Sequence, residues 1–373
     1  MARDREPIEA DAFSDLRSAI DEADEQILDL LNRRASLAAE VASRKQAAGT
    51  AFYVPTRERA IIDRLQEMNA GPFPTSAIRP VFQEVISACL SLESGVRVSY
   101  LGPEATFTHQ AAKRHFGTSA RMLPCGSIPG VFSEVERGAA EFGVVPVENS
   151  SEGVVTHTLD SFLDSGLAIA AEIQVLVEHC LLARPGVSER DLERVYSHPQ
   201  ALAQCRAWLT ANLPRATQVE TASTSDAGRA ALQDGGGAAI ASELAGQLYG
   251  LHPLRVKVQD TADNSTRFLV LSRPETDAGA PPVPGAMYKT TVLLAFSDRP
   301  GALFDLLKPL SEAGVNLTKI ESRPSRRRAW HYVFFLDLDG HSADPAIAPV
   351  LEEVARGCAL FKVLGSYRTA DTR

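Results

Sequence analysis

The first part of the chain has the spacing of hydrophobic residues that is typical of helices. No Pro or Gly occurs between Phe13 and Ala48, and apolar residues recur there every three or four positions. A helix of about 35 residues would be roughly 50 Å long, which two shorter helices of the same chain cannot cover. We therefore expect a second subunit to cover it, in a helical homodimer or a higher homo-oligomer. Pro55 can begin a second helix that ends before Gly71, and residues 74–93 supply a third.

Beyond residue 96 the pattern changes to short β-rich runs that alternate with helical stretches. This alternation predicts an α/β module of two lobes. The chain is expected to cross between the lobes at 174–183 and to return through 256–272, with a cleft between them. After a Pro- and Gly-rich linker the order β-α-β-β-α-β predicts a ferredoxin-like fold. The expected multidomain architecture is an all-α domain at 8–95, a two-lobed α/β domain at 96–273, a linker at 274–287 and an α+β domain at 288–370.

Composition and charge exclude several classes of function. The net charge is −9 and there is no long basic run, which argues against nucleic acid as a partner. The N-terminus lacks the apolar region of a signal peptide, and no apolar run approaches the roughly 20 residues of a membrane helix. The five cysteines form no CxxC pair and the eight histidines no HExxH motif, so no disulfide framework or metal site is indicated. We expect a cytoplasmic protein with reduced thiols.

Ionisable residues occupy inward-facing positions of the three predicted helices. They are Arg34, Lys45, Glu58 and Glu93, and Arg17 and Arg57 lie close beside the apolar stripes. Each one alone is explained by a long side chain whose stem packs while its head reaches water. Because a buried charge is costly unless it is paired, we interpret the whole set as a cavity for a dianionic ligand.

The segments LRxxID, RRxxLAxEVxxxK and RERxxI, within residues 13–95, resemble the all-helical chorismate mutases. The resemblance implies an interlocked dimer in which each active site takes an arginine, here Arg17, from the partner chain. Other ligand-contacting positions are then Arg34, Lys45, Arg57, Glu58, Cys89 and Glu93, and Val54 stands where some relatives have aspartate. Negative charge develops on the ether oxygen of chorismate during its rearrangement to prephenate. We expect Lys45 to donate to that oxygen, Glu93 to donate when protonated, and arginines to clamp the carboxylates.

Polar clusters follow the strands of the predicted α/β module. They are GPEATFTH (102–109), ENSSEG (148–153), SHP (197–199), STS (223–225) and DNSTRF (263–268). Any one of them can be an ordinary helix cap. Because ligands of open α/β sheets bind beyond the carboxyl ends of strands, near helix N-termini, we interpret them together as a site for a small anion.

The elements ENSSEG, YSHPQ and NSTRF resemble the prephenate dehydratases, over about residues 97–273. The resemblance implies a two-lobed fold like that of periplasmic binding proteins, a site in the cleft, and no metal or organic cofactor. Thr266 matches the family's catalytic threonine, and we assign it donation of a hydrogen bond to the leaving hydroxyl, since its pKa is too high for a general acid. Arg267 is expected to be structural or a distant clamp, and Ala105 replaces a usual glycine. The implied cleft-lining residues are Thr106, Glu148, Asn149, Ser150 and Ser151.

The segments DRPGALFDLLKPL (298–310) and NLTKIESRP (316–324) resemble ACT domains, which bind amino acids. An ordinary turn and strand remain the alternative. The resemblance implies that phenylalanine binds as an inhibitor at a subunit interface. The residues implied are Gly301, Ala302, Leu303, Glu321, Ser322, Arg323 and Pro324. The run Arg326-Arg327-Arg328 is interpreted as a solvated hairpin turn.

The three resemblances occur in the order of the bifunctional chorismate mutase/prephenate dehydratase family, the P-proteins. The implied substrates are chorismate and prephenate, with phenylalanine as effector. Two alternatives stay open: a non-catalytic sensor of aromatic metabolites, and a dehydratase that prefers arogenate. The sensor would explain the second and third modules but not the inward charges of the first.

Overall fold

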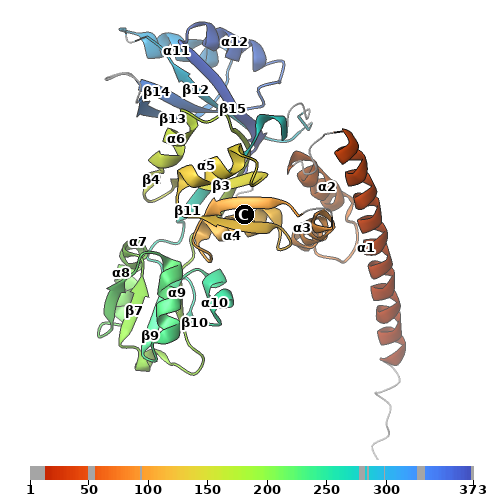
Figure 1. The fold of residues 1–373 in the computed structure, drawn as a ribbon, viewed down its shortest axis with the longest axis vertical. Helices are drawn as coiled ribbons and strands as arrows, with labels where there is room; N and C mark the ends of the chain where they lie inside the picture. Colours follow the sequence, from red (N-terminus) through yellow and green to blue (C-terminus); the bar gives the residue numbers. More distant parts are fainter. Residues whose placement is uncertain are drawn as a thin grey trace, which may run out of the picture.

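The structure, a computed structural model, is an elongated arrangement of a helical part, two α/β lobes and a C-terminal sheet (Figure 1). It describes residues 13–48, 55–92, 95–276, 282–283, 285–297, 299–325 and 332–370. Val54, Glu93 and residues 326–328, which carry predictions, lie outside these ranges, and so does the side chain of Lys45.

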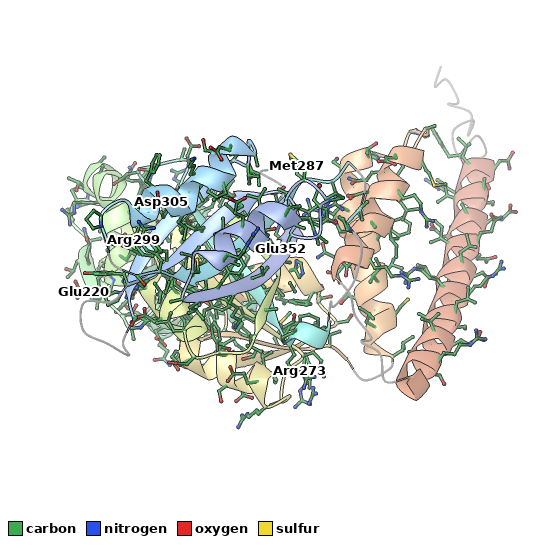
Figure 2. All side chains as sticks on the ribbon, turned by 90° about the horizontal axis from the view of Figure 1, so that it is seen from above. Glu220, Arg273, Met287, Arg299, Asp305 and Glu352 are labelled. Carbon is green, nitrogen blue, oxygen red and sulfur yellow. The ribbon has the colours of Figure 1, made fainter. Side chains whose placement is uncertain are left out.

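The helical part forms as the apolar spacing predicts, with α1 at Ser14–Ala48, α2 at Pro55–Met68 and α3 at Thr75–Ser91. Among the side chains of α1 up to residue 44, which the structure describes, only a short part is covered within one chain: Arg34, Ala35 and Ala38 are half-buried and Ala42 is buried. Figure 2 shows α1 at the edge of the molecule.

The apolar stripe of α1 is otherwise open. Leu31 and Val41 are 36% and 46% exposed within the single chain. Further exposed apolar side chains of this helix are Leu16, Ile20, Ile27, Leu28, Leu30 and Leu37. Within one chain α3 covers only a narrow side of α1, as expected for a helix too long to be covered by its own chain.

The first lobe is built on a mixed sheet whose strands run in the order β2-β1-β3-β11-β5, with β4 beside β3. β1 is parallel to β2 and β3, whereas β11 is antiparallel to β3 and β5. The strands are β1 Arg97–Leu101, β2 Arg121–Cys125, β3 Phe142–Asn149, β4 Gly153–Val154, β5 Ala168–Leu176 and β11 Ser265–Ser272. Helix α4 (Phe107–Phe116) covers one face, and α5 (Ile128–Glu136) and α6 (Thr156–Phe162) cover the other. The pattern of the sequence did not predict β2, β4 and α5.

The second lobe has a sheet of order β10-β6-β9-β7-β8. Its strands are β6 Cys180–Ala183, β7 Arg194–Ser197, β8 Thr217–Glu220, β9 Gly237–Ala241 and β10 His252–Arg255, and its helices are α7 Pro199–Gln204, α8 Arg206–Asn212, α9 Thr224–Gln233 and α10 Glu243–Tyr249. The chain enters this lobe between β5 and β6 and leaves it between β10 and β11, as predicted. These two crossings leave a cleft between the lobes, lined from the carboxyl ends of β1, β3, β5 and β7 and from the amino end of β11.

The C-terminal sheet has the ferredoxin-like order β13-β14-β12-β15, all antiparallel. Its elements are β12 Tyr288–Ala295, α11 Ala302–Glu312, β13 Leu317–Pro324, β14 Tyr332–Asp339, α12 Ala348–Arg356 and β15 Leu360–Arg368. Helices α11 and α12 cover one face. The other face carries Leu293, Phe335 and Leu364 into the same core as α5 and α6, so this sheet packs directly on the first lobe.

Candidate functional site

A cavity of about 360 Å³ lies between the two lobes. All five polar clusters noted in the sequence reach it, through Thr106, Asn149, His198, Ser223 and Thr266. Asn149 lies on β3 and Thr266 on β11. Apolar walls are formed by Phe107, Pro146, Val177 and Phe268. The expectation that polar loops at strand ends meet in one cleft is therefore confirmed for these residues.

Thr266 and Asn149 form the centre of this cleft. They are register partners on the antiparallel strands β11 and β3, and the Asn149 Nδ2 atom donates to Thr266 Oγ1 at 2.9 Å. The same Nδ2 donates to Asn264 Oδ1 at 2.9 Å, while Asn149 Oδ1 accepts from the backbone N–H of Ser151 at 2.9 Å. The threonine oxygen thus accepts a hydrogen bond from a fully engaged amide, and its own O–H remains available for a group in the cleft.

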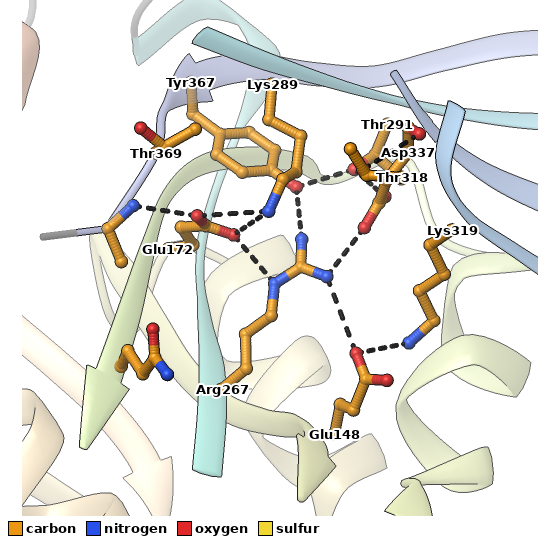
Figure 3. A network of polar contacts seen from close by, with 12 residues as sticks. Glu148, Glu172, Arg267, Lys289, Thr291, Thr318, Lys319, Asp337, Tyr367 and Thr369 are labelled. Carbon is orange, nitrogen blue, oxygen red and sulfur yellow. Dashed lines mark hydrogen bonds and ion pairs between the residues drawn. The ribbon is translucent and has the colours of Figure 1, made fainter. Parts of the chain in front are cut away.

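Glu148 does not line the cleft, contrary to the prediction. Successive residues of a strand face opposite sides of the sheet, so the inward orientation of Asn149 turns Glu148 away. Its carboxylate accepts from Lys319 Nζ of the C-terminal sheet at 2.7 Å (Figure 3). Arg267, the neighbour of Thr266, points to the same side, which fits the structural role expected for it.

Ser150 and Ser151 are also absent from the cleft lining, although both are described. Ser150 accepts from the backbone N–H of Ser265 at 2.9 Å, and its own N–H donates to the Ser265 carbonyl at 2.9 Å. Both serines are exposed. Their backbone and side-chain contacts hold the loop next to Asn149, and the two serines do not line the cleft as expected.

His179 is a cleft residue that sequence reasoning missed. It lies at the first crossing between the lobes, is 2% exposed, and has its Nε2 atom 3.0 Å from Gln204 Oε1. Burial is the main cause that lowers the pKa of its imidazole, which keeps the ring neutral. The ring also meets Phe107 edge-on, with 5.4 Å between centroids. The sequence around it reads as a β-strand and carries no motif, so only the crossing of the chain reveals it.

Thr106 caps α4, accepting from the His109 N–H at 3.4 Å, and it also borders the cleft. The preceding Ala105 has a φ of 67°, in the left-handed region that favours glycine. Its carbonyl accepts from Ser242 Oγ of the second lobe at 2.9 Å. The first-strand loop is therefore a contact between the lobes, which gives a physical reason for the small residue there.

In the helical part, Arg34 is turned toward α3, where its Nη1 atom donates to Cys89 Sγ at 3.0 Å. Arg17 is exposed and lies 17 residues earlier on the same helix, which is about 25 Å along the axis. Arg57 is exposed as well. One chain thus brings together Arg34 and Cys89 but not Arg17.

Glu58 borders a different cavity, of about 480 Å³, at the junction of α2 and α3 with α4, β5 and β15. Here Asp63 forms ion pairs with Arg368 of β15 and with Arg79 of α3, and Arg59 Nη1 donates to the Thr369 carbonyl at 2.8 Å. The helical part is therefore docked on the end of the C-terminal sheet through α2.

The predicted effector residues lie at two places in the C-terminal domain. Gly301 has a φ of 78° at the start of α11, where Ala302 is buried and Leu303 is 38% exposed. On β13, Arg323 forms an ion pair with Asp160 of α6, with an Nε–Oδ1 distance of 3.1 Å. Glu321 is half-buried, whereas Ser322 and Pro324 are exposed. Arg323 thus joins this domain to the first lobe.

The described residues contain no group of three or more His, Cys, Asp or Glu side chains placed to hold a metal ion. None of their helices combines the length and apolarity that crossing a membrane requires. The five cysteines are all free thiols.

Comparisons with known proteins match each part of this architecture. A family model described as chorismate mutase type II matches residues 16–94, one described as prephenate dehydratase matches 98–276, and one described as ACT domain matches 290–356. A relative from Aquifex aeolicus, named bifunctional chorismate mutase/prephenate dehydratase, is 46% identical over 362 residues, which is 96% of this chain and 98% of the relative.

Two solved structures are each similar to about three quarters of the chain. A prephenate dehydratase from Arthrobacter aurescens, in complex with L-Phe, is 38% identical with a TM-score of 0.68, and the match covers 74% of this chain and 91% of that one. A protein described as a novel type of quorum quenching acylase is 32% identical with a TM-score of 0.67, covering 74% of this chain and 98% of that one.

Proposed function

The chain belongs to the family of bifunctional chorismate mutase/prephenate dehydratases, and we propose that its dehydratase reaction takes place in the cleft around Thr266 and its mutase reaction beside Arg34. It is an enzyme with both activities and an ACT domain. We propose functional boundaries at 8–95 for the mutase, 96–273 for the dehydratase, 274–287 for the linker and 288–370 for the ACT domain.

The hydrogen bond from Asn149 to Thr266 is the observation that carries the dehydratase proposal. The conversion of prephenate to phenylpyruvate requires the ring hydroxyl to leave together with CO₂, and aromatisation drives it. Because Asn149 Nδ2 donates to Thr266 Oγ1 at 2.9 Å, the threonine O–H is oriented away from the amide. Thr266 then donates to the leaving hydroxyl, a preorganised contact that strengthens as negative charge develops on that oxygen. Neutral His179 and the neutral amides of the cleft avoid stabilising the departing carboxylate.

Replacement of Thr266 tests this role. Thr266→Val keeps the shape but removes the hydroxyl, and the formation of phenylpyruvate should fall about 100-fold, the usual loss for one preorganised donor. Thr266→Ser should keep most of the rate, because it retains the O–H. The mutase activity of the same preparation is the internal control for folding. A Thr266→Val enzyme with the wild-type turnover would exclude the proposed donor.

For the mutase, we propose that Arg34 and Arg57 clamp the substrate carboxylates, that Lys45 and protonated Glu93 donate to the ether oxygen, and that Glu58 and Cys89 complete the site. The contact of Arg34 with Cys89 supports a site between α1 and α3. Arg17 is supplied by a second subunit in a homodimer. The exposed apolar stripe of α1 supports this, since exposed contiguous apolar surface of this extent marks an interface.

We propose that phenylalanine inhibits the dehydratase by binding at the ACT domain, near residues 301–303 and 321–324. A related dehydratase has been solved with L-Phe, which supports this effector. β13 is an edge strand of its sheet, so a second copy can approach there and place the effector site at a subunit interface. Inhibition requires that phenylalanine bind the less active state more tightly.

The choice of substrate is the remaining part of the proposal. We propose prephenate over arogenate, and a cytoplasmic location for the enzyme. Since a similar structure is described as an acylase, the fold alone does not fix the reaction. Purified enzyme should be given chorismate, prephenate and arogenate separately, with phenylpyruvate and phenylalanine measured. Phenylpyruvate from prephenate is the expected product, whereas turnover of arogenate alone would reverse the assignment.

A further inference from the structure

Six ionisable side chains meet where the ACT sheet packs on the first lobe. We call them the interdomain charge cluster, and they are Glu148, Glu172 and Arg267 of the dehydratase with Lys289, Lys319 and Asp337 of the ACT domain (Figure 3). Three are cations and three are carboxylates, so the cluster is neutral only when both domains contribute. It is separate from the cleft, because none of the six lines that cavity.

Arg267 is the centre of the cluster. Its Nη1 atom lies 2.6 Å from Asp337 Oδ2, its Nε atom 2.7 Å from Glu172 Oε2, and its Nη2 atom donates to the Tyr367 hydroxyl at 2.9 Å. The side chains of Arg267, Glu172 and Asp337 are 17%, 5% and 6% exposed. Because buried charges are costly when a partner is removed, loss of Asp337 or of Lys289, which pairs with Glu172 at 3.0 Å, would leave a buried charge of the dehydratase only partly paired.

Glu148 is the second point of attachment. Lys319 Nζ lies 2.7 Å from Glu148 Oε2, and Arg267 Nη1 lies 3.8 Å from the same oxygen. Lys319 is the closer partner of this carboxylate and comes from β13, the edge strand of the ACT sheet. Glu148 and Arg267 are themselves register partners on β3 and β11.

The interdomain charge cluster lies on the face of the sheet opposite to Asn149 and Thr266. Asn149 follows Glu148 on β3, and Thr266 precedes Arg267 on β11, so Glu148 and Arg267 are each joined by one peptide unit to a cleft residue. Side chains alternate across a sheet, and therefore the ion pairs on one face fix the backbone that aims Asn149 and Thr266 on the other. The ladder is irregular between Arg267 and Phe268, so the ladder hydrogen bonds alone hold this end of the strands less firmly.

We propose that Lys319 and Asp337 of the ACT domain are positioning residues for the dehydratase reaction. They hold Glu148 and Arg267, and thereby keep Asn149 Nδ2 within hydrogen-bond distance of Thr266 Oγ1. This rests on the proposed role of Thr266. It also gives β13 a direct effect on catalysis: Lys319 shares the half-buried face of this strand with Glu321 and Arg323, so a shift of β13 changes the support of Glu148.

The test compares two Lys→Met variants at one interface. Lys319→Met removes the partner of Glu148, whereas Lys362→Met removes a lysine of β15 whose Nζ donates to the Ser165 carbonyl at 2.7 Å, away from the catalytic strands. Kinetics with prephenate should show about a tenfold lower kcat for Lys319→Met, with KM within about twofold, and an unchanged kcat for Lys362→Met. Lys319→Arg should restore kcat, and Asp337→Asn should lower it as Lys319→Met does.

A double variant separates positioning from simple domain docking. If Lys319 acts through Glu148, then Lys319→Met should have little further effect in a Glu148→Gln background. Equal losses of kcat in Lys319→Met and Lys362→Met, or full additivity with Glu148→Gln, would overturn the proposal. The Thr266→Val variant tests the proposed hydrogen-bond donor, the Thr266 hydroxyl, separately. If Thr266→Val is inactive while Lys319→Met has a normal kcat, then only the positioning role of the ACT domain fails.

Discussion

A mixed-dimer experiment would test whether the mutase site combines two subunits. Arg17 and Arg34 lie 17 residues apart on one straight helix, so about 25 Å separates their backbones along the axis. Two arginine side chains cannot close that distance on a ligand the size of chorismate. An Arg17→Ala dimer and an Arg34→Ala dimer should therefore each lose mutase activity about 100-fold, because every site lacks one clamp.

Mixing the two variants should restore one site. In a heterodimer one site lacks both arginines, and the other combines the intact Arg17 of one subunit with the intact Arg34 of its partner. Random association makes half of the dimers mixed, so the mixture should recover about one quarter of wild-type mutase activity. Heterodimers purified through two different tags should recover about half.

The assay follows the disappearance of chorismate after co-expression of the two variants. Dehydratase turnover with prephenate serves as the control, since neither arginine lies near the cleft. Normal activity of Arg17→Ala alone, or a mixture no more active than its components, would refute the shared site and the dimer argued from the open face of α1.

Three further predictions concern pH and regulation. Mutase activity should fall with rising pH as Glu93 loses the proton it donates, and Glu93→Gln should flatten that profile in initial-rate measurements. Saturating phenylalanine should lower dehydratase turnover, and Gly301→Val should raise the concentration required, because a branched residue is strained at a φ of 78°. Burial, together with Arg59 and Arg79, lowers the pKa of His115 from 6.5 to about 4. Below pH 6.5 the unfolded chain binds a proton that folded His115 takes up only near pH 4. The free energy of unfolding, measured in urea titrations, should therefore decrease as the pH falls from 6.5 to about 4.

Each of these has an outcome that contradicts it. An unchanged pH profile in Glu93→Gln would remove the role of the protonated carboxyl. Turnover that is insensitive to phenylalanine would remove the regulatory proposal. For His115, a His115→Gln variant with the same slope of stability against pH as the wild type would show that other groups cause the acid sensitivity.

The sequence was most informative about secondary structure, which depends on residues close together in the chain. Pro- and Gly-free apolar spacing located α1, and the alternation of β-rich and helical runs located most elements of the lobes and the ACT sheet. It missed the strands β2, β4 and β10, since strands this short carry little periodic signal, and it also missed the helix α5. The Thr-Arg-Phe element indicated β11, whose Thr266 lines the cleft.

The sequence motifs did not predict which face of the sheet each side chain points to. Glu148 and Asn149 occur in one motif, but a strand sends them to opposite faces, one to the ACT domain and one to the cleft. His179 reaches the cleft only because the chain crosses between lobes there.

The sequence by itself determined the order of the modules, the helical and strand periods, and the residue types for two sites. Only the tertiary structure decided which of those residues meet. Ion pairs such as Lys319 with Glu148, 171 positions apart, depend on how one sheet docks on another. Local spacing cannot encode such a contact, because it results from the burial of both domains' apolar faces and the pairing of the charges that this burial encloses.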